Sequence, residues 1–144
     1  MKVKDIMTEN PACCTADTNL QDVAKMMLDN DCGAIPVVED NNHKRPIGVV
    51  TDRDITIRTV AKGENPLNMT AKSVMTKNVF TVTPDTAIDD CVNLMQKHAV
   101  RRVPVVDEDG NCIGMVAQAD VAVKANDREG GELVEEVSKA SATS

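Results

Sequence analysis

Aromatic side chains are nearly absent from this sequence. Phe80 is the only aromatic residue, and there is no Trp or Tyr. A core without rings must be built from Val, Ile, Leu, Met and Ala, which suits helices packed on a sheet more than a sandwich anchored by aromatic residues. The same absence removes the usual stacking surface for single-stranded nucleic acid.

Basic residues are also in short supply. The chain has 16 Lys and Arg against 23 Asp and Glu, a formal net charge of −7. A nucleic-acid or anionic-membrane surface needs a basic field to collect phosphates, so neither kind of partner is expected. A single phosphorylated ligand remains compatible with this charge if basic residues converge locally.

The sequence also shows no pattern that predicts a membrane span, a leader sequence or a paired metal-binding cysteine motif. No apolar run approaches the length that crosses a bilayer, and no signal-peptide pattern opens the chain. The cysteines are odd in number and form no C-x-x-C pair, so we expect reduced, mostly apolar fillers in a cytoplasmic protein and no metal site. They are Cys13, Cys14, Cys32, Cys91 and Cys112.

The sequence contains an internal repeat, which decides the fold prediction. Shifted by 68 positions, the first half overlays the second, and two extra residues near 43–46 then change the shift to 66. A repeat in which several short motifs recur in the same order predicts two copies of one structural unit. The overlay pairs 4–8 with 72–76, 15–18 with 83–86, 35–38 with 103–106, and 47–50 with 113–116.

Each copy reads as β-α-β-β-α. A short strand precedes a helix whose apolar residues recur at i, i+3, i+4 and i+7, followed by two β-branched runs and a second helix. Thr18-x-x-Gln21 and Thr86-x-x-Asp89 have the form of capping boxes that open the first helix of each copy. The expected strands are 12–15, 34–39, 48–51, 80–83, 103–107 and 113–117, and the expected second helices are 54–62 and 120–126.

A three-stranded sheet of this size leaves one face unburied, so the two copies should pack together. We therefore predict an α+β fold with a first repeat and linker at 1–68, a second repeat at 69–126 and a tail at 127–144. In the tail, Leu133, Val134 and Val137 would form one face of a short helix.

The string Gly48–Asp54 carries the clearest candidate site. Thr51-x-x-Asp54 at a helix start is by shape a capping box, and capping alone would account for both residues. A carboxylate on the first helical turn is also suited to binding ribose hydroxyls, as acidic residues do in dinucleotide-binding folds. The residues leave both roles open, and both can hold at once.

These motifs resemble those of CBS domains. Gly48–Asp54 follows the pattern G-h-h-T-x-x-D (h, hydrophobic), and Arg101–Asp107 has another form typical of that family. The resemblance covers residues 3–125. The sequence is similar to those of small bacterial proteins made only of a CBS pair, such as the mycobacterial hypoxic response proteins. It implies a pair with pseudo-two-fold symmetry, a homodimer, and clefts between repeats that bind AMP, ADP, ATP or an S-adenosyl compound without catalysis.

The resemblance also implies residue roles in such a ligand site. Asp54 would accept hydrogen bonds from ribose, with Thr51 beside it. Asp120 would do the same in a second cleft, which either binds more weakly or takes a ligand lacking the phosphate, because Ala117 stands where the first copy has the threonine. The other implied contacts are Ile35, Pro36, Val103 and Pro104 around adenine, Arg53, Arg101 and Arg102 at phosphates, and Thr15.

Three readings of function compete. The preferred one is a nucleotide-binding regulatory module, and the alternative is a dimeric interaction module with empty clefts. A small enzyme or metal site using the cysteines and the cluster Asp85, Asp89 and Asp90 is the third, although acids in a first helical turn are already favoured by the helix dipole. The downstream protein partner is not indicated by the sequence.

Overall fold

The computed structural model describes residues 1–77 and 79–129, with side chains described through residue 124. The chain forms two compact units. Unit 1 contains Met1–Glu9, Phe80–Asp107 and the described residues from Ile113 on, and unit 2 contains Asn10–Val79 and Glu108–Cys112. The predicted tail helix around Leu133 lies outside the described residues.

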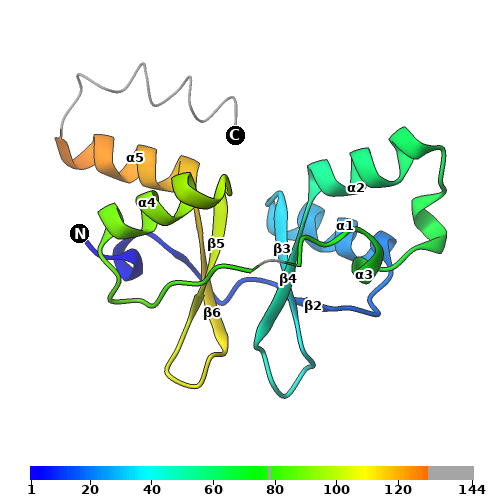
Figure 1. Cartoon of the computed structure of the whole chain (residues 1–144), viewed down its shortest axis with the longest axis horizontal. Helices are drawn as coiled ribbons and strands as arrows, with labels where there is room; N and C mark the ends of the chain where they lie inside the picture. The colour runs from blue at the N-terminus through cyan, green and yellow to red at the C-terminus, as the bar shows by residue number, and fades with distance from the viewer. Residues whose placement is uncertain (78, 130–144) are drawn as a thin grey trace. The chain divides into compact units, whose positions relative to one another are not determined.

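Unit 2 contains a three-stranded sheet in the order β2-β3-β4. The strands are β2 (Cys14–Thr15), β3 (Ala34–Val38) and β4 (Pro46–Thr51); β2 runs parallel to β3, and β4 antiparallel. The helices α1 (Leu20–Asn30), α2 (Asp52–Arg58) and α3 (Ala71–Val74) gather beside β3 and β4 (Figure 1). The 3₁₀ turns η2 (Val60–Lys62) and η3 (Pro66–Asn68) link α2 to α3.

Unit 1 has the matching plan. Its sheet has the order β1-β6-β5, with β1 (Thr8–Glu9), β5 (Arg102–Val106) and β6 (Cys112–Ala117), and η1 (Val3–Asp5) precedes β1. The helices α4 (Ile88–His98) and α5 (Gln118–Glu129) lie beside β5 and β6 (Figure 1). In place of the strand predicted at 80–83 there is a single parallel bridge between Val82 and Val105.

The predicted apolar stripes form the cores. In unit 2, α1 buries Leu20, Val23 and Met27 against β3 and β4, whereas Ala24, at the i+4 position of the predicted pattern, is exposed. In unit 1 the equivalent stripe of α4 is buried against β5 and β6 and consists of Ile88, Cys91 and Met95. The β-α-β-β-α reading is therefore confirmed in its helices and its two long strands per copy.

The segment that opens each repeat packs on the sheet formed by the long strands of the other repeat. The N-terminal strand β1 pairs with β6, so that Thr8 is opposite Met115. In unit 2 the linker residue Thr76 makes the equivalent bridge to Val49 of β4. The compact units thus exchange short segments between the sequence repeats, whose proposed bounds at 1–68 and 69–126 stay a prediction.

Two of the predicted capping boxes are wrong. The N-cap of α1 is Asn19, whose side chain accepts a hydrogen bond from the Asp22 N–H at 2.9 Å. The N-cap of α4 is Ala87, with no side-chain cap. Thr18 and Thr86 instead bind backward: each hydroxyl accepts the backbone N–H three residues earlier, at 3.0 Å, and closes a turn before the helix.

The ends of the second helices differ slightly from prediction. In the first copy, α2 ends at Arg58, and η2 continues to Lys62, where Gly63 at φ 73° stops it. A left-handed conformation at this position favours glycine. In the second copy, α5 begins two residues before the predicted start and extends to Glu129.

Candidate functional site

The capping box at Thr51 and Asp54 is confirmed. The Thr51 hydroxyl accepts the Asp54 backbone N–H, and Asp54 Oδ2 accepts the Thr51 N–H, both at 3.0 Å. The bonds satisfy two donors that the start of α2 would otherwise leave unpaired. Asp54 is only 8% exposed, so its carboxylate is held at the helix start and does not point into bulk solvent.

The second oxygen of Asp54 faces a residue that sequence reasoning missed. Arg58 Nε lies 3.7 Å from Asp54 Oδ1, one helical turn farther along α2. The spacing i, i+4 between an acid and a base on a predicted helix was the available signal. A carboxylate has about four acceptor positions, so Asp54 keeps capacity for a ligand hydroxyl beside these two partners.

The start of β3 lies next to this helix start. Ala34 is opposite Thr51 in the β3–β4 register, and the Asp52 N–H donates to the Gly33 carbonyl at 3.0 Å. The next residues, Ile35 and Pro36, are buried. Unit 2 therefore brings the predicted apolar pair close to the predicted ribose-binding pair along one end of the sheet.

Thr15 is placed away from this group. It pairs with Val38, at the opposite end of β3 from Ala34. Four residues of strand correspond to about 13 Å. Its hydroxyl is 3.2 Å from that of Thr18 in the turn before α1. A single small ligand at Asp54 is thus far from Thr15 of the same unit.

The predicted phosphate contact of this unit, Arg53, lies on the first turn of α2. It is exposed, and its backbone N–H donates to the Asp52 side chain at 2.8 Å.

Unit 1 holds the remaining candidates in equivalent positions. The Gln118 N–H donates to the Arg101 carbonyl at 2.8 Å, which is the counterpart of the bond between Asp52 and Gly33. Arg101 is exposed just before β5, whereas Arg102 is half-buried within it. The other three candidates are Val103 and Pro104, both buried, and Asp120, half-buried in the first turn of α5.

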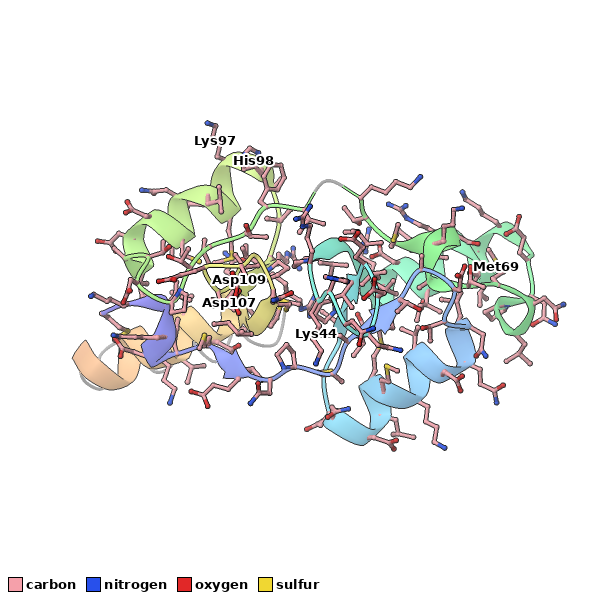
Figure 2. The ribbon with its side chains drawn as sticks, turned by 90° about the horizontal axis from the view of Figure 1, so that it is seen from below. Lys44, Met69, Lys97, His98, Asp107 and Asp109 are labelled. Carbon is pink, nitrogen blue, oxygen red and sulfur yellow. The ribbon has the colours of Figure 1, made fainter. Side chains whose placement is uncertain are left out.

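One ring contact was not predicted. Phe80 stacks on His98, the last residue of α4, with ring centroids 3.6 Å apart and an interplanar angle of 12°. Figure 2 shows His98 and Lys97 together at the end of α4. Both bases are in the last turn, where positive charge is favoured by the helix dipole.

The aspartates that suggested an enzyme or metal site occupy structural positions. Asp85 lies 3.4 Å from Lys4 and 3.7 Å from Lys2, and Asp89 and Asp90 occupy the first turn of α4. Within residues 1–77 and 79–129, no group of three His, Cys, Asp or Glu side chains is placed to hold a metal ion. Among the helices described, none is long and apolar enough to cross a bilayer.

The cysteines differ in acidity. Burial raises the pKa of the Cys14 thiol to about 12 and also raises the pKa of Cys91. The pKa of Cys13 is lowered, chiefly by a side-chain hydrogen bond from Cys112, with the charge of Lys44 adding to the effect.

Two β-α-β-β-α copies, the first of which carries a Thr-x-x-Asp box at the start of its second helix, define a tandem domain of the regulatory class. Residues 3–58 and 71–126 each match the CBS domain, and the chain belongs to that family. Its fold is that of a CBS domain pair, which confirms the prediction made from the repeated motifs.

Similar proteins share most of the length of the chain. YhcV, a CBS domain-containing protein of Bacillus subtilis, is 37% identical over 133 residues, with 91% of each chain covered. Hypoxic response protein 1 of Mycobacterium tuberculosis is 35% identical over 119 residues, which are 83% of this chain and 81% of that protein.

Solved structures show what similar pairs bind. The CBS domain pair of MJ0100, in complex with 5′-methylthioadenosine and S-adenosyl-L-methionine, superposes with a TM-score of 0.79 at 26% identity, covering 89% of this chain and 98% of that one. A crystal structure of Hypoxic Response Protein I contains two coordinated zinc ions and superposes with a TM-score of 0.74 at 34% identity, covering 85% and 98%.

Proposed function

We propose that this chain is a non-catalytic regulatory module that binds an adenine nucleotide or adenosyl ligand, with Asp54 and Thr51 at the ribose. The observation that carries the proposal is the buried carboxylate of Asp54, fixed by the cap and by Arg58. An acceptor held in place loses little freedom on binding, so its bonds to a ligand diol cost little ordering entropy. The adenosyl ligands of the MJ0100 pair support this ligand class.

We place the remaining contacts as the motifs suggest. In unit 2, Ile35 and Pro36 would contact an adenine base and Arg53 a phosphate, and Thr15 would contact ligand at a position separate from Asp54. In unit 1, Val103 and Pro104 would contact a base, and one of Arg101 and Arg102 a phosphate. Asp120 would bind a second ligand more weakly because Ala117 offers no hydroxyl. The five cysteine thiols support a reducing, cytoplasmic location.

We also propose that the module is a homodimer. Large apolar side chains are exposed on the α2–η3 segment of unit 2: Ile57 is 40% exposed, Val60 62% and Leu67 61%. Apolar residues that gather on one exposed segment are typical of protein–protein contacts.

The test of the ligand proposal is a thermal-shift panel of AMP, ADP, ATP, S-adenosylmethionine and methylthioadenosine, followed by calorimetric titration of the compound that raises the midpoint. Asp54→Asn keeps an oxygen for the Thr51 N–H but removes the charge. We expect its affinity to fall about 10- to 150-fold, the loss of a charge-assisted hydrogen bond of roughly 1.5–3 kcal/mol.

Two variants make this test specific. Asp52→Asn changes the same charge in the same helix outside the capping box and should leave affinity nearly unchanged. Asp120→Asn should cost less than Asp54→Asn, and equal losses would refute the proposed difference between the two sites. If no adenosyl compound shifts the midpoint, the interaction module without a ligand becomes the better description.

A further inference from the structure

Two cysteines separated by most of the sequence lie together in unit 2. Cys13 stands immediately before β2, and Cys112 opens β6 at the end that belongs to the same unit. The Cys112 side chain lies within hydrogen-bonding reach of the Cys13 sulfur. This pairing is independent of the ribose-binding residues, and neither the repeat nor the CBS motifs predicted it.

Backbone contacts fix the position of Cys112. Its N–H donates to the Lys44 carbonyl at 2.8 Å, and the Lys44 N–H donates to Asn111 Oδ1 at 2.9 Å. Lys44 lies on the turn between β3 and β4 (Figure 2). The turn that leads into β6 is therefore tied to the β3–β4 turn, which holds the Cys112 thiol near Cys13.

The two thiols differ in access. Cys13 is half-buried and its Sγ is 3.3 Å from the Pro11 carbonyl, whereas Cys112 is only 5% exposed. A reagent in solution therefore reaches Cys13 first. Cys112 is sheltered from direct attack but lies next to any mixed disulfide that forms on the Cys13 sulfur.

The surroundings also favour Cys13 as the nucleophile. A hydrogen bond from Cys112 and the nearby charge of Lys44 hold the pKa of the Cys13 thiol below its ordinary value, against the opposing effect of partial burial. The adjacent Cys14 is in the opposite condition, because burial raises its pKa to about 12. The thiolate is the reactive form, so Cys13 reacts in preference to its neighbour.

We propose that Cys13 and Cys112 are a reversible redox pair that forms a disulfide by exchange with a low-molecular-weight disulfide such as oxidised glutathione. The bond would join the segment before β2 to the β5–β6 turn within unit 2. It would make the packing of that turn dependent on the thiol–disulfide balance of the surroundings.

The exchange proceeds in two steps. The Cys13 thiolate attacks one sulfur of the small disulfide, whose S–S bond breaks and releases one thiolate that takes up a proton. The Cys112 sulfur, losing its proton, then attacks the Cys13 sulfur of the mixed disulfide and releases the second small thiol. Two protein thiols are oxidised to one disulfide, and one small disulfide is reduced to two small thiols.

The experiment uses the full chain in a series of glutathione buffers from reduced to oxidised. Free thiols are blocked by alkylation at each point, and the linked peptides are identified by mass spectrometry without reduction. We expect an intact mass that is lower by two hydrogens before alkylation, a single Cys13–Cys112 cross-link that reduced glutathione reverses, and a raised thermal midpoint in the oxidised form. The rise is expected because a cross-link restricts the unfolded chain.

Three variants separate the roles of the residues. Cys112→Ala should stop at a glutathione adduct on Cys13, and Cys13→Ala should form neither adduct nor cross-link at these positions. Lys44→Gln should slow adduct formation roughly two- to fivefold, the effect of one charge at short range in a high-dielectric setting. Cys32→Ser, at an exposed cysteine outside the pair, is the matched control and should oxidise like the parent protein.

Three outcomes would overturn the proposal. One is a cross-link between any other two cysteines as the main product. Another is a stable adduct on Cys13 that Cys112 does not resolve in the parent protein. The third is a Cys13 no more reactive than Cys32, and peptide mapping of the parent protein decides all three without relying on a variant that fails to fold.

Discussion

At the scale of single residues, hydroxyl side chains before helices have two uses that look alike in sequence. Thr51 is an N-cap whose bond runs forward to Asp54, whereas Thr18 and Thr86 bind backward and close a turn. The pattern Thr-x-x-acid or Thr-x-x-amide matches all three. What differs is a second threonine three residues earlier, at Thr15 and Thr83, which competes for the same hydroxyl.

The reassigned cap of α1 gives a direct prediction. Asn19→Ala removes the acceptor for the Asp22 N–H and should lower the free energy of unfolding by about 1 kcal/mol. Gln21→Ala is the control, because Gln21 is exposed and takes no part in the observed cap. Denaturant titration measures both, and a larger loss for Gln21→Ala would restore the capping box first predicted.

The candidate site could be predicted in part. The Thr51–Asp54 box follows from adjacent residues, so the sequence alone was enough to identify it. The pairing of Arg58 with Asp54 could be predicted only from the i, i+4 spacing on a helix that was itself a prediction. The pairing of Cys13 with Cys112 depends on contacts between segments distant in the sequence, which the sequence pattern does not contain. The position of Thr15 could not be predicted either, because strand register decides which end of β3 it joins.

At the scale of elements, each methionine of the repeated Met-Thr segment covers a glycine in the neighbouring strand. A Cβ on Gly48 would lie 2.7 Å from Met75 Sδ, and one on Gly114 would lie 2.7 Å from Met7 Sδ. The glycine of the G-h-h-T motif is therefore explained by close packing of a chain segment. The periodicity that predicted the strands contains no information about this exchange between repeats.

This packing predicts a coupled stability effect. Gly48→Ala should lower the free energy of unfolding by about 1–3 kcal/mol, since the added methyl group overlaps the Met75 side chain. In a Met75→Ala background the penalty should shrink but not vanish, because the Thr76 carbonyl remains 3.0 Å from the new Cβ. A double-mutant cycle by denaturant unfolding measures the coupling, and strictly additive losses would contradict this account.

At the scale of the whole molecule, the chain is a regulatory domain pair, and its surface properties indicate which kinds of partner it can bind. Its net charge of −7 disfavours a phosphate-rich macromolecular partner. The exposed apolar residues of the α2–η3 segment begin one residue before Arg58, the ion-pair partner of Asp54. A contact formed there would border the helix that holds the proposed ribose acceptor, which links assembly and ligand binding through one element.

The dimer proposal is tested at this segment. Val60→Lys places a charge at a residue that is 62% exposed, so the isolated fold should tolerate it, whereas a buried contact between copies should not. We expect light scattering to show a shift from dimer to monomer at micromolar concentration. Leu28→Lys changes an even more exposed apolar residue, 79% exposed on α1, and should leave the dimer intact. Equal dissociation by both variants would show that added charge, and not this segment, governs assembly. A parent protein that is monomeric would contradict the dimer proposal itself.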